Sequence, residues 1–334
     1  MPHTFLNEAL KPLKPYLNDP GIIEICVNRP QQVFIERAGV SGMEYFFLED
    51  LSEKRIQQIG ERVAQTTSQS VNAATPLLST ELPTGERIQV VLPPAAPEGG
   101  SLTIRKQVVR NLRLEDYKVS GALKNITVSQ SGLSALEEDL VTLLKDNTED
   151  SIEKFLGKAA QNRVSMVISG GTGSGKTTFL NMLLNEIAET ERLITIEDTK
   201  ELNPPQKNTV SLLYSRNDQG MAKVDAEQLV AASLRMRPDR ILIGELRGTE
   251  TLSFLEAINT GHPGSLTTVH ANSPNEAYHR LANLILKSSN GLTKQDILDD
   301  LKRSIPLVIQ IGHEGVQRGR IKEIFYAPAF TTGE

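Results

Sequence analysis

Cysteine is almost absent from this chain, where Cys26 is one residue among 334. A single cysteine excludes an internal disulfide framework and any zinc module built from cysteine pairs. Such scarcity is typical of proteins that work in a reducing compartment such as the cytosol.

Long apolar runs and an excess of basic residues are also missing. No run approaches the roughly 18–20 apolar residues that span a bilayer, and the N-terminus has no apolar segment of the signal-peptide type. The 36 Lys and Arg residues against 41 Asp and Glu residues give a net charge of −5. This balance argues against nucleic-acid binding as the main activity, although a local basic groove formed on assembly stays open. The composition is that of a soluble globular protein, and the length predicts two domains.

The first part of the chain, residues 1–112, mixes strand-like and helical patterns. Residues 53–67 carry apolar side chains at helical spacing. Four short apolar runs are typical of strands, at residues 21–28, 32–36, 87–94 and 101–106. The mixture predicts a small N-terminal α+β domain.

The hydrophobic pattern changes at residues 113–150, which are polar and weakly periodic. One helix is expected there, over residues 139–150. We interpret this stretch as a linker between domains. From 151 to 334, helical segments alternate with apolar runs, which is typical of a parallel sheet in α/β units. The strand-like runs are residues 164–170, 192–198, 240–246 and 265–270.

The segment VISGGTGSGKTTFL carries the strongest motif. It matches the phosphate-binding pattern G-x-x-x-x-G-K-[ST], with an apolar strand before it and a helical stretch after it. Glycines let the loop curl around phosphate with its N–H groups inward, and the helix N-terminus adds partial positive charge. Lys176 can neutralise the β- and γ-phosphates, and Thr177 can place its hydroxyl on Mg²⁺. The predicted nucleoside-triphosphate site comprises Gly170, Gly171, Thr172, Gly173, Ser174, Gly175, Lys176, Thr177 and Thr178.

Carboxylates stand at the ends of two other predicted strands, where ligands lie in an open parallel sheet. Glu245 follows an apolar run and suits a Walker B acid that binds Mg²⁺ through water; a solvated rim is the alternative. Of Glu197 and Asp198, at most one faces the phosphates, because adjacent strand side chains point to opposite faces. A carboxylate there could orient and activate the attacking water, or it could simply cap a turn.

His270 ends the strand within GHPGSLTTVHANSP, residues 261–274. Ser273 and Glu276 have capping-box spacing, with proline at the first helical position, so His270 also suits an ordinary strand–helix junction. An imidazole at this strand end could instead donate a hydrogen bond to the γ-phosphate and relay its loss to the following helix. His262 lies in the turn at the other end of the strand and is expected away from the nucleotide.

Four blocks occur in order along the chain: GGTGSGKTT, RLITIEDTKEL, LRMRPDRILIGELRG and GHPGSLTTVHAN. Together they resemble the secretion-ATPase superfamily of RecA-like motors, and most of all the traffic ATPase of bacterial type IV secretion and conjugation systems, the eleventh component of the VirB apparatus. NDPGIIEICVNRPQQVFIE, TGERIQVVLPP and SLTIRK resemble the N-terminal domain of that family. The resemblance therefore spans most of the chain. It implies an α/β fold, with a RecA-like P-loop ATPase domain over residues 151–334 behind a smaller N-terminal α+β domain.

The resemblance also implies roles for the strand-end residues. Lys176 and Thr177 would act in the Walker A loop as described above. Glu197 would be the leading candidate for general base, Glu245 the Walker B acid, and His270 the histidine that reads the γ-phosphate. The implied cofactors are ATP and Mg²⁺, with the ion held by Thr177 and Glu245. Which of the two glutamates is the general base stays open.

Two arginines of the N-terminal domain, Arg87 and Arg105, lie in strand-like runs. Taken alone, each is more typical of an ordinary strand arginine on a solvated face. The resemblance implies that both reach toward the nucleotide phosphates, for which the fixed donor fork of arginine is suited.

The resemblance implies a homo-hexameric ring, with nucleotide between the two domains. The ring would couple ATP hydrolysis to substrate transfer or pilus assembly. The expected partners are other secretion-system ATPases and inner-membrane components, with peripheral membrane association at the cytoplasmic face of the bacterial inner membrane. The length of the segment 113–150 leaves open whether the N-terminal domain docks on its own ATPase domain or on a neighbour's.

Three other functions are alternatives to this hypothesis. A type II secretion or pilus-retraction motor is disfavoured, because a tetracysteine zinc module is missing and residues 257–261 read AINTG where retraction motors usually carry AIRAG. A nucleotide-gated assembly platform with slow turnover would use the same nucleotide site. A nucleic-acid translocase would bind DNA with a steep salt dependence, and the acidic composition disfavours it.

Overall fold

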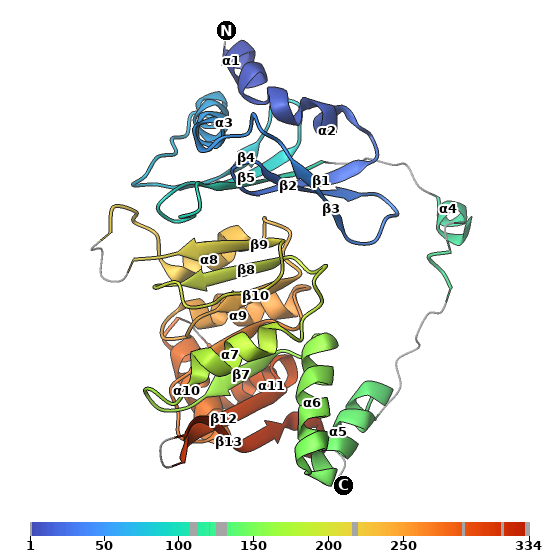
Figure 1. Cartoon of the computed structure of the whole chain (residues 1–334), viewed down its shortest axis with the longest axis vertical. Coiled ribbons are helices and arrows are strands. Elements are labelled where there is room, and N and C mark those ends of the chain that lie inside the picture. Colours follow the sequence, from blue (N-terminus) through green and yellow to red (C-terminus); the bar gives the residue numbers. More distant parts are fainter. Residues whose placement is uncertain are drawn as a thin grey trace.

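The structure is a computed structural model of the chain. It describes residues 2–106, 113–119, 121–124, 132–215, 220–288, 291–314 and 317–330. Two β-sheets lie one above the other along the long axis (Figure 1). We call residues 2–106 the N-terminal domain and residues 132–330 the P-loop domain.

The N-terminal domain has a six-stranded antiparallel sheet in the order β3-β2-β1-β6-β5-β4. Its helices cover the face that points away from the P-loop domain (Figure 1). The helices are α1 (Pro2–Ala9), η1 (Lys11–Leu13), α2 (Lys14–Asn18) and α3 (Glu53–Thr66). The strands are β1 (Ile22–Arg29), β2 (Gln32–Arg37), β3 (Met43–Phe47), β4 (Leu77–Glu81), β5 (Arg87–Val91) and β6 (Ser101–Arg105).

Helix α3 confirms the helix predicted over residues 53–67. The Ser52 side chain caps its first turn by accepting a hydrogen bond from the backbone N–H of Arg55. Ile56, Ile59 and Val63 are fully buried in one hydrophobic cluster with the sheet. Their spacing of three and four residues places them on a single stripe of the helix, which is why this helix packs on the sheet.

Among the described residues, three helices lie between the N-terminal domain and β7: α4 (Leu114–Val119), α5 (Ala135–Asp146) and α6 (Glu149–Gln161). The helix expected over 139–150 is divided in two. Asn147 takes a left-handed conformation, with φ of 51°, which ends α5, and Thr148 then caps α6. Leu140 of α5 and Phe155 of α6 are buried in a core cluster of the P-loop domain. These two helices therefore pack as part of that domain.

The P-loop domain has a seven-stranded sheet in the order β13-β12-β7-β11-β10-β8-β9, parallel except for the β12–β13 pair. Its strands are β7 (Met166–Ser169), β8 (Leu193–Glu197), β9 (Thr209–Leu213), β10 (Arg240–Ile243), β11 (Leu266–Val269), β12 (Leu307–Glu314) and β13 (Gln317–Tyr326). The helices that accompany them are α7 (Lys176–Leu184), α8 (Ala226–Ser233), α9 (Glu250–Asn259), α10 (Pro274–Leu286), α11 (Lys294–Ser304) and η3 (Ala327–Phe330). None of the helices in the described part of the chain has the length and apolar character needed to cross a membrane.

The four predicted strands of this domain are confirmed as β7, β8, β10 and β11. They are adjacent in the sheet and buried on both faces, which explains their nearly continuous apolar sequences. The P-loop follows β7, His270 follows β11, Glu245 follows β10, and Glu197 ends β8. Because parallel strands end at the same edge, the residues predicted to carry chemistry gather there.

The N-terminal sheet faces the β9 edge of the P-loop domain (Figure 1). Arg237 makes a bidentate ion pair with Glu36 of β2, with both N–O distances at 2.8 Å. The fully buried Arg192 donates to Asn28 of β1 and, at 2.6 Å, to Asn208. Apolar residues of the N-terminal domain also join a core cluster of the P-loop domain. Within one chain, the N-terminal domain thus contacts its own P-loop domain through a buried interface.

Candidate nucleotide-binding site

The P-loop borders a cavity of about 610 Å³ at the carboxyl edge of the sheet. Residues 172–179 line it, and α7 begins at Lys176, so the loop and the helix N-terminus face the same space. Glu197, Glu245 and His270 line the same cavity. The structure therefore brings the predicted phosphate loop and the predicted strand-end residues into one site.

Two glycines of the loop have structural reasons to lack a side chain. A Cβ atom on Gly170 would lie 2.5 Å from Ser174 Oγ and 2.7 Å from the carbonyl oxygen of Ile311, which is too close for both. Gly175 has φ of 92°, a left-handed conformation that glycine adopts without strain. It lies against Gly319 of β13, whose N–H donates to the carbonyl of Ser174 at 2.7 Å. The β12–β13 hairpin therefore supports the loop.

Lys176 is 8% exposed, and its ammonium group is held by neutral acceptors. It donates to the carbonyl oxygens of Gly170 and Gly171, each at 2.9 Å, and it contacts His270 Nδ1 at 3.2 Å. Burial lowers the pKa of Lys176, and the negative charge of Glu245 opposes this effect. Phosphate oxygens would replace these neutral acceptors by charge-assisted ones, which form stronger hydrogen bonds.

His270 bridges Lys176 and Glu245. Because a lysine ammonium can only donate, His270 Nδ1 must accept, and the ring proton then lies on Nε2. Nε2 faces Glu245 Oε1 at 3.3 Å, while Oε2 of the same carboxylate contacts the Arg247 guanidinium. Burial and the neighbouring Lys176 lower the pKa of His270, which favours the neutral ring. The partners of His270 thus determine its tautomer.

Glu197 is a buried carboxylate, 2% exposed, with its two oxygens in different surroundings. Oε1 accepts hydrogen bonds from the backbone N–H groups of Glu201 and Leu202, both at 2.9 Å, whereas Oε2 has no hydrogen-bond partner among the described residues. Burial raises the pKa of Glu197, and the two backbone bonds oppose that rise. Gly244 leaves room for this side chain, since a Cβ atom there would lie 3.3 Å from Glu197 Cγ. A fixed carboxylate with a raised pKa has the properties of a general base.

Two cationic residues of the cavity were missed by the sequence reasoning, Arg247 and Arg318. Arg247 lies two residues after Glu245 in the same motif block, and this proximity could have indicated it. Arg318 comes from β13, far along the chain, and no motif marks it. It reaches the loop because β12 pairs with β7 and carries the hairpin with it.

His262 lies at the other end of β11, where its Nδ1 contacts the carbonyl of Ala257 at 3.1 Å. It is not among the residues that line the nucleotide cavity in the described chain. This position agrees with the expectation that His262 lies away from the nucleotide.

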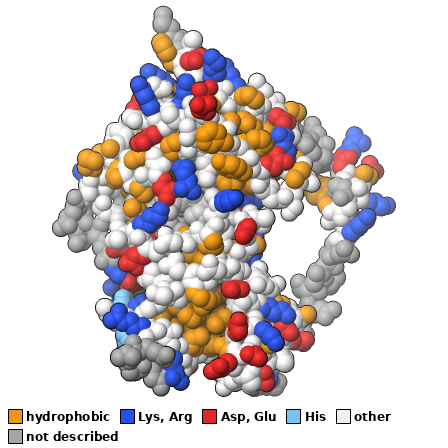
Figure 2. Space-filling view, viewed as in Figure 1, with side chains coloured by type: hydrophobic (Ala, Val, Ile, Leu, Met, Phe, Trp, Pro, Cys, Tyr) orange, Lys and Arg blue, Asp and Glu red, His pale blue; other side chains and the backbone are white. Residues whose placement is uncertain are grey.

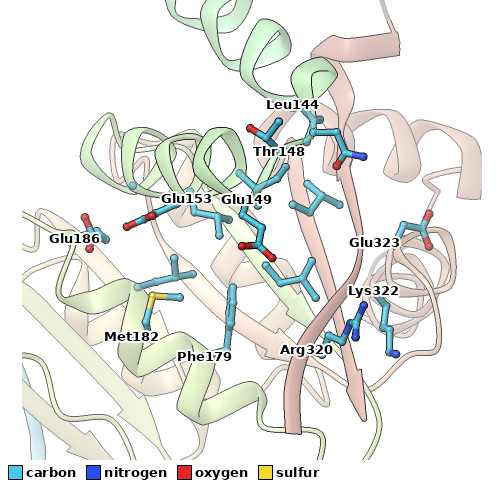
Figure 3. Close-up of a pocket in the computed structure, with 17 residues that line it drawn as sticks. Leu144, Thr148, Glu149, Glu153, Phe179, Met182, Glu186, Arg320, Lys322 and Glu323 are labelled. Atoms are coloured by element: carbon cyan, nitrogen blue, oxygen red, sulfur yellow. The ribbon is translucent and has the colours of Figure 1, made fainter. Parts of the chain in front are cut away.

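A second cavity, of about 850 Å³, borders the P-loop helix α7 (Figure 3). Phe179 and Met182 of α7 line both cavities. Glu153 of α6 and Arg320 of β13 belong to the other walls, and Figure 2 shows hydrophobic side chains gathered over this part of the surface. The two cavities therefore share part of α7 as a common wall.

The two predicted arginines of the N-terminal domain do not line the nucleotide cavity of their own chain. Arg87 begins β5, Arg105 ends β6, and the two are opposite each other in the register of these strands. Both line a separate cavity of about 410 Å³, together with Arg235 of the P-loop domain. Arg105 also pairs with Glu24 at 2.9 Å. Within one chain, the structure therefore separates these arginines from the P-loop.

The donors in the cavity fit a magnesium ion that arrives with a nucleotide. No cluster of three or more His, Cys, Asp or Glu side chains suited to a metal ion occurs among the described residues. Magnesium bound with a nucleotide needs only one or two protein ligands, because phosphate and water oxygens complete its octahedral shell. Thr177 and Glu245 both line the cavity, where a hydroxyl and a carboxylate would be the oxygen ligands for such an ion.

Comparison with known proteins relates this chain to one family. The family model for type II/IV secretion system proteins matches residues 7–312. The chain is 39% identical over 333 residues to the type IV secretion system protein VirB11 of Brucella abortus, covering 97% of this chain and 90% of the relative. It is 38% identical over 334 residues to VirB11 of Bartonella henselae, covering 96% and 92% of the two chains. With protein VirB11 of Agrobacterium tumefaciens it shares 38% identity over 307 residues, 91% and 89% of the two chains.

A solved structure matches both domains. The crystal structure of the VirB11 ATPase from the Brucella suis type IV secretion system, in complex with sulphate, aligns with a TM-score of 0.88 and 38% sequence identity. The alignment covers 97% of this chain and 98% of that chain. The similarity therefore extends over both sheets and is not confined to the P-loop.

Proposed function

We infer the function of this chain from its family, since it belongs to the type II/IV secretion system proteins and, among them, to the VirB11-type ATPases. It is an ATPase of a type IV secretion system, in which ATP hydrolysis powers substrate transfer, pilus assembly or both. The matches cover 96–97% of this chain, 92% of the Bartonella henselae relative and 98% of the Brucella suis structure, so the inference concerns both domains.

The observation that carries this function is the single cavity shared by the P-loop and the strand-end side chains. ATP hydrolysis requires a phosphate cradle, a cation on the β- and γ-phosphates, an acid for Mg²⁺ and a group that orients water. The loop with Lys176 provides the first two. Glu245 and Glu197 supply the carboxylates for the others, and His270 lies between Lys176 and Glu245.

In the proposed mechanism, ATP binding draws Lys176 away from the carbonyls of Gly170 and Gly171 and onto the β- and γ-phosphates. The exchange replaces neutral acceptors by charged ones and is favourable for that reason. It also removes the hydrogen bond that Lys176 donates to His270 Nδ1. His270 stands four residues before α10, so a change in its hydrogen bonding can pass to that helix. His270 therefore senses the nucleotide in this mechanism.

Glu197 is the proposed general base. Its Oε1 atom is fixed by two backbone N–H groups, which leaves Oε2 to accept a proton from the attacking water. Most of the rate comes from positioning and charge stabilisation, because the transferring phosphoryl group needs little covalent help from the protein. Glu245, in contact with Arg247 and His270, is the proposed acid that holds Mg²⁺ through water.

The proposed substrate is the complex of ATP with Mg²⁺. Thr177 and Glu245 are the residues that would hold the ion. When bound, Mg²⁺ neutralises charge on the β- and γ-phosphates.

A homo-hexameric ring is the proposed working form. Arg87 and Arg105 lie outside the nucleotide cavity of their own chain, so their proposed contact with phosphates requires a neighbouring copy. The proposed place of work is the cytoplasmic face of the bacterial inner membrane, with peripheral attachment. The proposed partners are other secretion-system ATPases and inner-membrane components.

Substitution of Lys176 by alanine tests this function. Lys176→Ala is expected to lower steady-state ATP turnover at least roughly 100-fold, because the cation on the phosphates is lost. It should also abolish secretion in cells that carry it as the sole copy. Lys154→Ala, an exposed lysine on α6, is the matched control and should leave both unchanged. A Lys176→Ala variant without ATPase activity that still supports secretion would contradict the motor and favour a nucleotide-gated platform.

A further inference from the structure

A buried glutamate holds the turn that joins Glu245 to α9, residues 244–250, which we call the Glu245 turn. Glu250 is the first residue of α9 and is 8% exposed. Its Oε1 atom accepts hydrogen bonds from the backbone N–H groups of Arg247, at 2.6 Å, and Gly248, at 2.8 Å. The side chain therefore folds back from the helix onto the turn that precedes it. No sequence motif predicts a role for this residue.

Gly248 allows Glu250 to approach the Glu245 turn closely. A Cβ atom on Gly248 would lie 2.8 Å from Glu250 Oε2, which is closer than side-chain atoms approach. Thr251 adds another contact, because its hydroxyl donates to the carbonyl of Gly248 at 2.8 Å. Three hydrogen bonds from two side chains thus fix the end of the turn to the first residues of α9.

The start of the Glu245 turn is held by β11. Leu246 is fully buried, and its N–H donates to the carbonyl of Thr268 at 3.0 Å. The Thr268 hydroxyl donates to the carbonyl of Gly244 at 2.8 Å. The backbone of Arg247 is therefore fixed between two anchored segments, while its side chain, 40% exposed, lines the nucleotide cavity.

The Arg247 side chain connects this anchored backbone to Glu245. Its guanidinium contacts Oε2 of Glu245, and Oε1 of the same carboxylate faces His270 Nε2 at 3.3 Å. A carboxylate that serves a metal ion is oriented by the groups that hydrogen-bond it from behind, and loss of such a group commonly costs roughly 10- to 100-fold in metal affinity or activity. Arg247 is in the position of such a group, and Glu250 holds its backbone.

We propose that Glu250 is a positioning residue of the magnesium site. It fixes the backbone of Arg247, and the Arg247 guanidinium holds the Glu245 carboxylate toward the ion that arrives with the nucleotide. The inference rests on the proposed function, in which Glu245 holds Mg²⁺ through water. An acid in the first turn of a helix also stabilises that helix, but this local effect alone would leave the magnesium-dependent part of nucleotide binding unchanged.

Binding of a fluorescent, non-hydrolysable ATP analogue is the first test, measured with Mg²⁺ and with EDTA in its place. Glu250→Ala is expected to raise the Kd in Mg²⁺ by roughly 10- to 100-fold and to leave the Kd in EDTA unchanged. Glu250→Gln should keep most of the affinity, because the amide oxygen can accept the same two N–H bonds. Asp296→Ala is the matched control, since Asp296 is an exposed acid in the first turn of α11 that accepts from the Thr293 hydroxyl at 2.6 Å. Its Kd should equal that of the unsubstituted chain in both conditions.

A double variant decides whether Glu250 acts through Arg247. Arg247→Ala should show the same magnesium-dependent loss of affinity as Glu250→Ala. The variant with both substitutions should bind the analogue in Mg²⁺ no more weakly than Arg247→Ala alone, because the second change removes support from a side chain that is already missing. The Mg²⁺ concentration that gives half-maximal ATP turnover should rise in all three variants and show the same lack of additivity.

Three results would overturn the inference: unchanged affinity of Glu250→Ala in Mg²⁺, equal losses in Mg²⁺ and EDTA, or losses that multiply in the double variant. If Glu250→Ala did not fold, Arg247→Ala would carry the test, and an unchanged Kd of that variant in Mg²⁺ would overturn the inference. The proposed function would stand in each case, because the unsubstituted chain would still hydrolyse ATP. A chain that bound the analogue but hydrolysed no ATP would contradict the proposed function, while the binding measurements would still decide the role of Glu250.

Discussion

Glu197 and Glu245 are two carboxylates in one cavity whose surroundings differ. Glu245 lies between the cationic side chain of Arg247 and the N–H of His270. Glu197 is buried, and only one of its oxygens has hydrogen-bond donors in the described chain. Carboxylates with different environments commonly take different chemical roles in one active site. At the residue scale, this contrast is the reason to assign Mg²⁺ to Glu245 and proton acceptance to Glu197.

The pH dependence of turnover tests the role of Glu197. Burial raises its pKa, and a base acts only when deprotonated, so the acidic limb of kcat should lie at higher pH than the value of about 4.3 for an ordinary glutamate would give. Glu197→Gln is expected to lower kcat by roughly 10²- to 10⁴-fold. Steady-state assays from about pH 5 to about pH 9 measure both effects. Glu256→Gln, at an exposed position on α9, is the control.

The raised pKa of Glu197 also affects the stability of the fold, which it lowers at neutral pH. A carboxyl whose pKa is raised in the folded state stabilises the fold as the pH falls through that pKa, and its ionised form costs stability above it. Glu197→Gln should therefore unfold at no lower urea concentration than the unsubstituted chain at neutral pH. A large loss of stability, or a full retention of turnover, would contradict the assignment of Glu197.

Residues at strand ends could be predicted because a parallel sheet brings those ends to one edge. Glu197, Glu245 and His270 each follow an apolar run that is recognisable in the sequence. Arg318 and Arg235 could not be predicted in this way. Arg318 reaches the P-loop cavity because the β12–β13 hairpin, from the far end of the chain, pairs with β7. The position of Arg235 depends on the contact between the two domains.

At the scale of elements, the ends of the helices show which structural details a sequence pattern predicts and which it does not. Ser273 caps α10 by accepting from the N–H of Glu276, as its spacing predicts. The Glu276 carboxylate, however, accepts from the N–H of Asn272 at 3.1 Å, so the reciprocal bond closes one residue earlier than in a capping box. Asn147 ends α5 within the expected helix, because asparagine tolerates the left-handed conformation that few residues adopt.

The contact between β2 and the segment before β10 provides a test at this scale. Removing Glu36 and Arg237 singly and together should give a coupling energy of roughly 1–2 kcal/mol in urea unfolding, because the pair is bidentate and mostly buried. The matched pair is Glu8 and Lys11, which is exposed and separated by 3.8 Å. Its coupling should stay below about 0.5 kcal/mol. Equal coupling in both pairs would mean that the domains do not hold this contact in solution.

At the scale of the whole molecule, the N-terminal sheet lies at the β9 edge, apart from the chain's own P-loop. A core cluster to which both domains contribute residues holds it there. The two-domain organisation and the α/β class could be read from the pattern of apolar runs. The docking of the domains could not, because polar and charged residues such as Arg192, Asn28 and Asn208 carry much of it and have no periodic signature.

The proposed mechanism requires nucleotide to be bound between copies of the chain, since Arg87 and Arg105 of one copy lie away from its own P-loop. The molar mass in solution, measured with a non-hydrolysable ATP analogue and Mg²⁺, tests this claim most directly. We predict the mass of six chains. A chain that remains a monomer at every concentration tested, with and without the analogue, would contradict the proposed mechanism.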